Sequence, residues 1–273
     1  MLSLIMAILS SAMVSIVMRF SDGKVRSDLG MLVMNYLMCS LLAAGSAANL
    51  FDSGLSVGIL GGINGFLYLA SFVLFQKNVR QNGVVLSATF MKLGLLVTMV
   101  VSVCLYAEMP DLWEALGFLM ALFAIILINY NKEAGTAGSK AGLLWLLLCG
   151  GMADAMSKIF EESGTSGMGD AFLFFTFATA LILCSIHTAA KGQRIGKEEV
   201  LFGLLIGIPN FYSSRFLLGA LGSMSAVIVY PVYSVGTILV VTLTGLFLFR
   251  ERLSRRQWVA LAIILAALVL LNS

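Results

Sequence analysis

One lysine lies deep inside an apolar segment, where a charged side chain is costly. Lys92 stands eleven residues beyond Gln81, which is about 16 Å along a helix and so near the middle of a bilayer. A lysine at a helix centre costs about 2.5–3.5 kcal/mol on insertion, and such residues usually face the interior of a helix bundle. Lys92 is therefore a candidate anchor for a substrate carboxylate or phosphate. The alternative is a lysine that snorkels to the interface or pairs structurally with an acid.

Asp154 is the only acid well inside an apolar segment, and it stands four residues before Lys158. Residues four positions apart share a helix face. A carboxylate in an apolar site takes up a proton more readily than one in water, so Asp154 and Lys158 are candidates for a coupling role. A static Asp–Lys pair near the outer end of the helix is the alternative interpretation.

Four uncharged polar residues complete the candidate binding set. Asn64 and Asn210 lie close to glycines at related places in the two halves of the chain. Asparagine offers two donors and an acceptor, which suits an amino acid or a sugar, but it also joins helices through hydrogen bonds. Tyr230 and Tyr233 flank Pro231, and a proline frees a helix carbonyl that can line a cavity.

The composition offers few residues that could bind a metal or catalyse a reaction. The chain has one histidine, His187, and its four cysteines lie inside apolar runs at no metal-like spacing. We therefore predict no metal and no cofactor. A membrane-embedded enzyme would need a nucleophile, a histidine or a carboxylate pair gathered at one depth, and the sequence contains no such cluster, so we predict no enzymatic activity. The basic residues are spread over short connections, which argues against nucleic-acid binding.

The elements that must position these side chains are transmembrane helices. Of the 273 residues, 60% are hydrophobic and only 11% are charged, and the mean hydropathy is +0.99. A spanning helix needs about 20 mostly apolar residues. The sequence predicts an all-α integral membrane protein with ten spans, near residues 1–19, 29–50, 56–76, 83–106, 112–130, 141–160, 170–190, 199–219, 224–249 and 256–272.

The two halves of the chain repeat one another. Glu108 and Glu251 end the fourth and ninth predicted helices and stand 143 positions apart. Asp111 and Ser254 follow, each with an acid or amide three residues later, which is the capping-box pattern of a helix start. An odd number of helices per repeat places the second copy in the opposite orientation, so we expect two inverted five-helix repeats. The first repeat, the linker and the second repeat cover residues 1–131, 132–140 and 141–273.

The sequence resembles the EamA-type members of the drug/metabolite transporter superfamily. The resemblance rests on a proline-bearing helix with Pro231, the following Glu251 and the small residue Ala260 early in the last helix. The first repeat matches less closely, because Ala88 stands where Pro231 does, while Glu108 is kept. The resemblance covers ten helices in two halves. It implies a secondary transporter of small metabolites, but no particular substrate, because the shared residues are structural.

Loop charge predicts the orientation in the membrane. Fourteen of the seventeen basic residues fall on alternate connections, whereas the opposite connections carry acids. Basic loops stay cytoplasmic, so we expect both termini outside the inner (plasma) membrane. Ten-helix relatives in bacteria are usually drawn with both termini inside. We follow the charge, because its bias is nearly complete.

Together these features predict a permease. We expect a secondary active transporter, and more specifically an exporter, of a small metabolite such as an amino acid, bound near the midplane between the repeats. The alternatives are an exporter of cationic drugs, for which Asp154 is the candidate site, and a structural or sensory membrane protein without transport. The expected partners are the substrate and the lipid bilayer, and the sequence does not indicate an oligomeric state.

Overall fold

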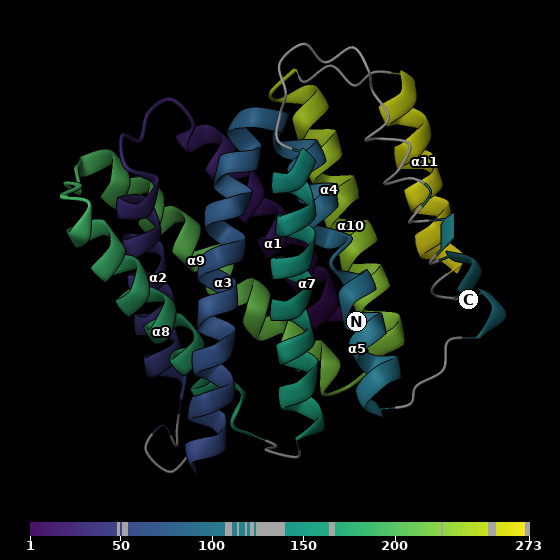
Figure 1. Ribbon diagram of the computed structural model, residues 1–273, viewed down its shortest axis with the longest axis horizontal. Coiled ribbons are helices and arrows are strands. Elements are labelled where there is room, and N and C mark those ends of the chain that lie inside the picture. The colour runs from purple at the N-terminus through teal and green to yellow at the C-terminus, as the bar shows by residue number, and fades with distance from the viewer. Residues whose placement is uncertain are drawn as a thin grey trace.

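The described part of the chain is built from helices alone (Figure 1). The computed structural model describes residues 1–47, 50, 54–106, 111–113, 115–117, 119–120, 123, 140–163, 167–224, 226–250 and 255–270. The first half contributes α1 Leu2–Ser21, α2 Asp28–Ser46, α3 Gly54–Asn82, α4 Val84–Lys92 and α5 Leu95–Tyr106. The second contributes α7 Lys140–Glu162, α8 Gly169–Ala190, α9 Lys197–Leu221, α10 Ala226–Phe247 and α11 Arg255–Leu270.

Seven segments of the described chain are long and apolar enough to cross a membrane, with α4 and α5 together counted as one. Shorter apolar helices cover Val232–Phe247 and Trp258–Ala267. Most of the span predicted at 112–130 lies outside the described residues, as do Glu108, Glu251, Ser254 and residues 132–139 of the predicted linker. Asp111 is described, and its carbonyl accepts a hydrogen bond from Ala115 N–H at 3.0 Å, which suits a helix start.

The span predicted over 83–106 corresponds to one candidate span, Val84–Tyr106, but the helix within it is interrupted. The helix stops after Lys92, and Leu93 and Gly94 form a turn before α5 begins. Glycine at this turn lets α7 approach closely, because a Cβ on Gly94 would lie 2.6 Å from the backbone nitrogen of Gly151. The predicted third span was also too short, since α3 continues to Asn82. Gly83 then reverses the chain with a φ of 81°, a conformation that favours glycine.

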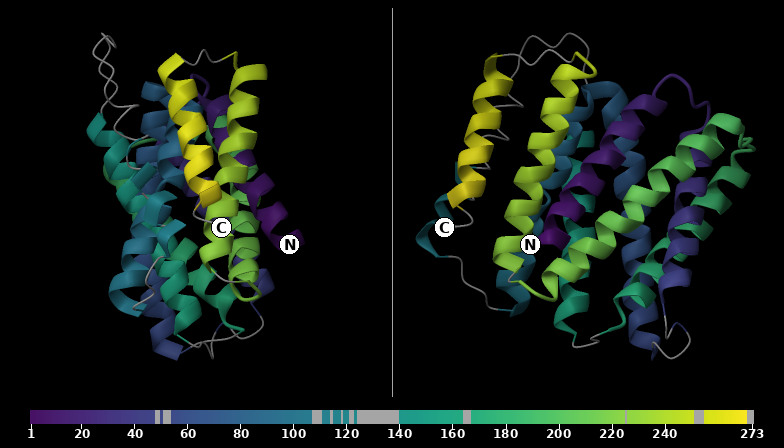
Figure 2. Two further views of the ribbon diagram at one scale, coloured as in Figure 1. Left: turned by 90° about the vertical axis from the view of Figure 1, so that its right-hand side faces the viewer. Right: turned by 180° about the vertical axis from the view of Figure 1, so that it is seen from behind.

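Helices of one half pack mainly on helices of the other. The chief contacts join α1 to α9 and α10, α2 to α8 and α9, α3 to α7 and α8, α4 to α7 and α10, and α5 to α7. In chain order, α1, α2 and α3 correspond to α7, α8 and α9, and α4 with α5 corresponds to α10. When every helix is replaced by its corresponding helix, each of these contacts becomes a contact that is also present. In Figures 1 and 2, α11 lies at one edge of the bundle, beside α10.

Small residues permit the closest helix approaches. Gly61 and Gly65 face α8, and Gly203 and Gly207 face α2, in each case with the partner's backbone where a Cβ would stand. The four-residue spacing places both glycines of each pair on one helix face. Close backbone contact of this kind supplies van der Waals packing in a membrane, where apolar side chains gain little from leaving lipid.

We predict that Gly203→Ala lowers the free energy of unfolding by about 1–3 kcal/mol, the usual cost of overpacking. The new Cβ would lie 2.5 Å from the Met31 carbonyl oxygen and from the Met34 Cβ. Gly219→Ala on the same helix is the control, because nothing lies within 4 Å of its Cβ position. The control should leave melting in detergent unchanged or raise it slightly. Equal melting of both variants would contradict close packing of α9 on α2.

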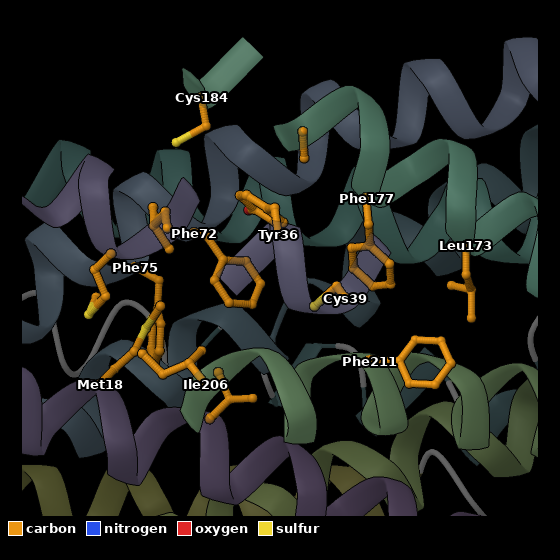
Figure 3. Close-up of a cluster of buried hydrophobic side chains, with 14 of the residues drawn as sticks. Met18, Tyr36, Cys39, Phe72, Phe75, Leu173, Phe177, Cys184, Ile206 and Phe211 are labelled. Carbon is orange, nitrogen blue, oxygen red and sulfur yellow. The ribbon is translucent and has the colours of Figure 1, made fainter. Parts of the chain in front are cut away.

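Aromatic and sulfur-containing side chains fill the core between α1, α2, α3, α8 and α9 (Figure 3). Tyr36 stacks on Phe177 with ring centroids 6.5 Å apart. The free cysteines Cys39 and Cys184 are buried in this core, as expected for small apolar residues, whereas Cys104 is exposed and Cys149 half-buried. This packing holds the helices that surround the cavity described below.

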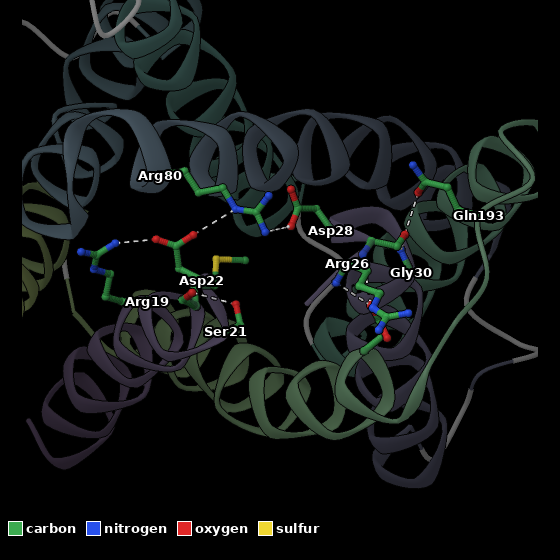
Figure 4. A network of polar contacts seen from close by, with 11 residues as sticks. Arg19, Ser21, Asp22, Arg26, Asp28, Gly30, Arg80 and Gln193 are labelled. Atoms are coloured by element: carbon green, nitrogen blue, oxygen red, sulfur yellow. Dashed lines mark hydrogen bonds and ion pairs between the residues drawn. The ribbon is translucent and has the colours of Figure 1, made fainter. Parts of the chain in front are cut away.

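Ion pairs gather at the upper end of the bundle in Figure 1, where α1, α3 and α8 end. Arg80 on α3 bonds both Asp22, at 3.2 Å, and Asp28 on α2, at 2.6 Å (Figure 4). The Glu199 carboxylate at the start of α9 accepts from the backbone N–H groups of Arg26 and Ser27. This end therefore joins four helices, and we call it the basic end because the predicted basic connections after α1, α3 and α8 begin there.

Candidate functional site

A buried polar cavity of about 50 Å³ lies between the two halves. Helices α1, α3 and α4 of the first half and α7, α9 and α10 of the second contribute to it. Its polar lining is formed by Ser11, Ser15, Tyr68, Ser71, Lys92, Asp154, Asn210, Ser213, Ser214 and Tyr233. The volume admits a few water molecules, whereas drug-sized ligands occupy pockets of about 300–1,000 Å³. In the described conformation the cavity is therefore too small for a molecule of that size.

Lys92 lies at the end of α4, directly before the break in that helix. Its side chain is buried, and its ammonium lies 3.7 Å from the centroid of the Tyr233 ring. Within the described residues, no carboxylate is close enough to form an ion pair with it. The Lys92 carbonyl, freed by the break, accepts a hydrogen bond from Ser234 Oγ at 3.3 Å. Lys92 is thus held by an aromatic face, and its positive charge remains available to a ligand.

Asp154 reaches the same cavity from α7. Its carboxylate forms no ion pair with any described residue, Lys158 included. The Tyr230 hydroxyl donates instead to the Asp154 backbone carbonyl at 2.9 Å. Lys158 does not line the cavity, and its ammonium lies 5.7 Å from the Tyr106 ring on α5. The structure therefore places Lys92 with Asp154, one charge from each half, and separates both from Lys158.

The two asparagines take different places. Asn210 lines the cavity and donates to the Asn35 side-chain oxygen at 3.2 Å. Asn64 lies outside the cavity lining and donates to the Thr176 hydroxyl at 3.4 Å. Both bonds cross between the halves, so each asparagine joins helices, and Asn210 also faces the cavity.

The sequence reasoning overlooked the hydroxyl groups of the cavity. The Tyr68 hydroxyl bonds Ser214 Oγ at 2.8 Å, and the Tyr233 hydroxyl bonds Ser213 Oγ at 2.9 Å. These pairs join α3 to α9 and α9 to α10 at the level of Lys92. The paired serines at 213 and 214 in an otherwise apolar helix were the available signal, because buried hydroxyls need partners.

This arrangement is suited to binding a small molecule with both charges. Lys92 can bond a carboxylate, Asp154 can bond an ammonium group, and hydroxyl and amide groups lie between and around them. The described residues contain no group of histidine, cysteine or acidic side chains able to hold a metal ion. The break in α4–α5 beside Lys92 resembles the discontinuous helices that form substrate sites in transporters.

The fold and this cavity define a multi-pass helical membrane protein with a polar site enclosed between its halves. Residues 140–273 match the model of the EamA-like transporter family. The second half of the chain is thus similar to the EamA-like transporter family, as the sequence resemblance predicted. The family consists of membrane transporters of small solutes.

Two further similarities extend over most of the chain. An uncharacterized protein of Haemophilus influenzae (strain Rd) is 24% identical over 210 residues, which are 75% of this chain and 72% of that protein. A protein crystal structure with 15% sequence identity covers 98% of this chain and 94% of its own, with a TM-score of 0.67. At this level of identity the second similarity concerns the fold alone.

Proposed function

We propose that this chain is a secondary active transporter that exports a small zwitterionic metabolite, such as an amino acid. The observation that carries the proposal is the placement of Lys92 and Asp154 in one buried cavity, neither in an ion pair with a described residue. Charges inside a membrane protein without an ion-pair partner are costly, so a ligand that supplies both opposite charges would satisfy both residues at once.

The proposed mechanism is alternating access by two inverted five-helix repeats, with ten spans in total. The helix contacts support this proposal, because they occur in corresponding pairs. The contact of α1 with α9 corresponds to that of α7 with α3, and the contact of α2 with α9 corresponds to that of α8 with α3. In such transporters one repeat rocks against the other around a central site. Because the described cavity is too small for an amino acid, the proposal requires the halves to separate at one end before substrate enters.

We further propose that the basic end faces the cytoplasm and that both termini lie outside. The support is the positive-inside rule, and helices α1 and α11 respectively begin and end away from the basic end (Figure 1). A reporter that is active only in the cytoplasm should be silent when fused after Ser273. A strong cytoplasmic signal from that fusion would reverse the proposed orientation.

The function is tested by comparing metabolites released from cells that overexpress the chain with those from empty-vector cells. We expect one or a few amino-containing acids to accumulate outside the overexpressing cells. Counterflow of the same compound in proteoliposomes should then demonstrate direct transport. Selective release of organic cations would support the alternative of a cationic-drug exporter. No difference in release and no counterflow would favour a structural or sensory protein.

A further inference from the structure

A second, larger pocket of about 650 Å³ lies at the basic end, away from the central cavity. Helices α2, α3 and α8 form its walls, and Gln193 closes it from the connection between α8 and α9. Figure 4 shows Arg26, Asp28, Arg80 and Gln193 around this region. None of its lining residues is shared with the cavity that holds Lys92.

The rim of this pocket is strongly cationic. Four basic residues, Arg26, Lys77, Arg80 and Lys191, line it against a single acid, Asp28. Arg80 is already bonded to Asp28 at 2.6 Å, so these two charges largely offset each other. The side chains of Arg26, Lys77 and Lys191 form no ion pair with a described residue. Three positive charges from three parts of the chain therefore line one pocket without an ion pair to a described residue.

The floor of the pocket is apolar. Its remaining helix lining consists of Leu29, Leu32, Leu69, Ala70, Val73 and Leu74. Along α3, Val73 precedes Lys77 by four residues, which is about 6 Å toward the middle of the membrane. A ligand in this pocket would meet cations at the membrane surface and hydrocarbon directly beneath them. A free phosphate uses only the first of these features, whereas a phospholipid uses both.

We infer that this pocket binds an anionic phospholipid, with its phosphate between Lys77 and Lys191 and an acyl chain along α3. Basic pockets between transmembrane helices on the cytoplasmic side are suited to anionic headgroups. The lipid would connect α3 to α8 at the end where Arg80 joins α3 to α2. Occupancy would favour the conformation in which the basic end is closed. The inference is independent of which metabolite crosses the central cavity.

The test is titration of the detergent-solubilised full chain with phosphatidylglycerol, read by native mass spectrometry and by melting temperature. Lys77→Gln combined with Lys191→Gln should weaken binding roughly thirtyfold, given the usual contribution of each basic residue near an anionic surface. Arg194→Gln combined with Lys197→Gln is the matched control, because it removes the same charge from exposed residues outside the pocket. The control should weaken binding less than about threefold. Phosphatidylcholine should bind poorly to every variant.

Three results would overturn the inference. Equal weakening by both double variants would indicate a diffuse surface attraction. Unchanged binding in the pocket variant would exclude the two lysines. Competition by inorganic phosphate at the concentration of the lipid would indicate a site for free anions. Each lysine is also replaced singly and the melting temperature measured without lipid, so that a folding defect in the double variant leaves the comparison intact.

Discussion

Transport should fall about ten- to hundredfold in Lys92→Met, whereas the protein should melt no earlier than the unchanged chain. The loss in transport corresponds to one hydrogen bond between charged groups, worth about 1.5–3 kcal/mol. The expected melting temperature of this variant depends on a different balance of interactions. Methionine occupies a similar volume and loses the contact with the Tyr233 ring, but it also removes the cost of keeping a charge inside the membrane. The measurements are proteoliposome counterflow and melting in detergent.

Lys24→Met is the control for that experiment. The Lys24 ammonium also faces aromatic rings, 5.4 Å from Phe202 and 6.0 Å from Phe20, but the residue is exposed and far from the cavity lining. The control should transport at the normal rate. Full transport by Lys92→Met, or loss of its melting transition, would contradict a substrate-binding role and favour a structural one.

The sequence predicted the helices well, because each span is a local property of composition. The observed bounds of α1, α8 and α9 lie within about two residues of the expected ones, which is the usual precision of helix ends. The depth of Lys92 was counted from Gln81 as if both lay on one helix, but Gln81 belongs to α3 and the chain reverses at Gly83. The helix of Lys92 begins at Val84, eight residues or about 12 Å before it. The turn at Leu93 and Gly94 could not be predicted, because a single glycine is tolerated inside a helix. Here the backbone of Gly151 on α7 packs against Gly94, and that contact cannot be read from the local sequence.

Partners across the cavity were harder to predict than depth. Asp154 and Lys158 share a helix face by spacing, yet the structure directs them to different neighbours, Tyr106 being the contact of Lys158. Asn64 and Asn210 have related places in sequence, but only Asn210 faces the cavity. These outcomes depend on which helices cross at that depth, and helix crossing depends on contacts more than a hundred positions apart in the chain.

Asp154→Asn should reduce transport of the zwitterionic metabolite by about ten- to hundredfold, the effect of losing one bond between charged groups. Asparagine retains the shape and one acceptor but removes the charge that would hold the ammonium group. Melting should change little, because the Asp154 carboxylate forms no ion pair with a described residue. Asp170→Asn is the control, since Asp170 bonds Arg215 at 3.0 Å outside the cavity.

The double variant, Lys92→Met with Asp154→Asn, separates a shared ligand from two independent roles. Groups that hold one substrate act as a unit, so their losses are strongly non-additive. We therefore expect the double variant to transport about as poorly as the worse single variant. Losses that multiply would indicate that the two residues act in different steps, with Asp154 serving proton coupling rather than the substrate. A transport rate for Asp154→Asn that becomes insensitive to the proton gradient would support that second role and contradict the proposed ammonium contact.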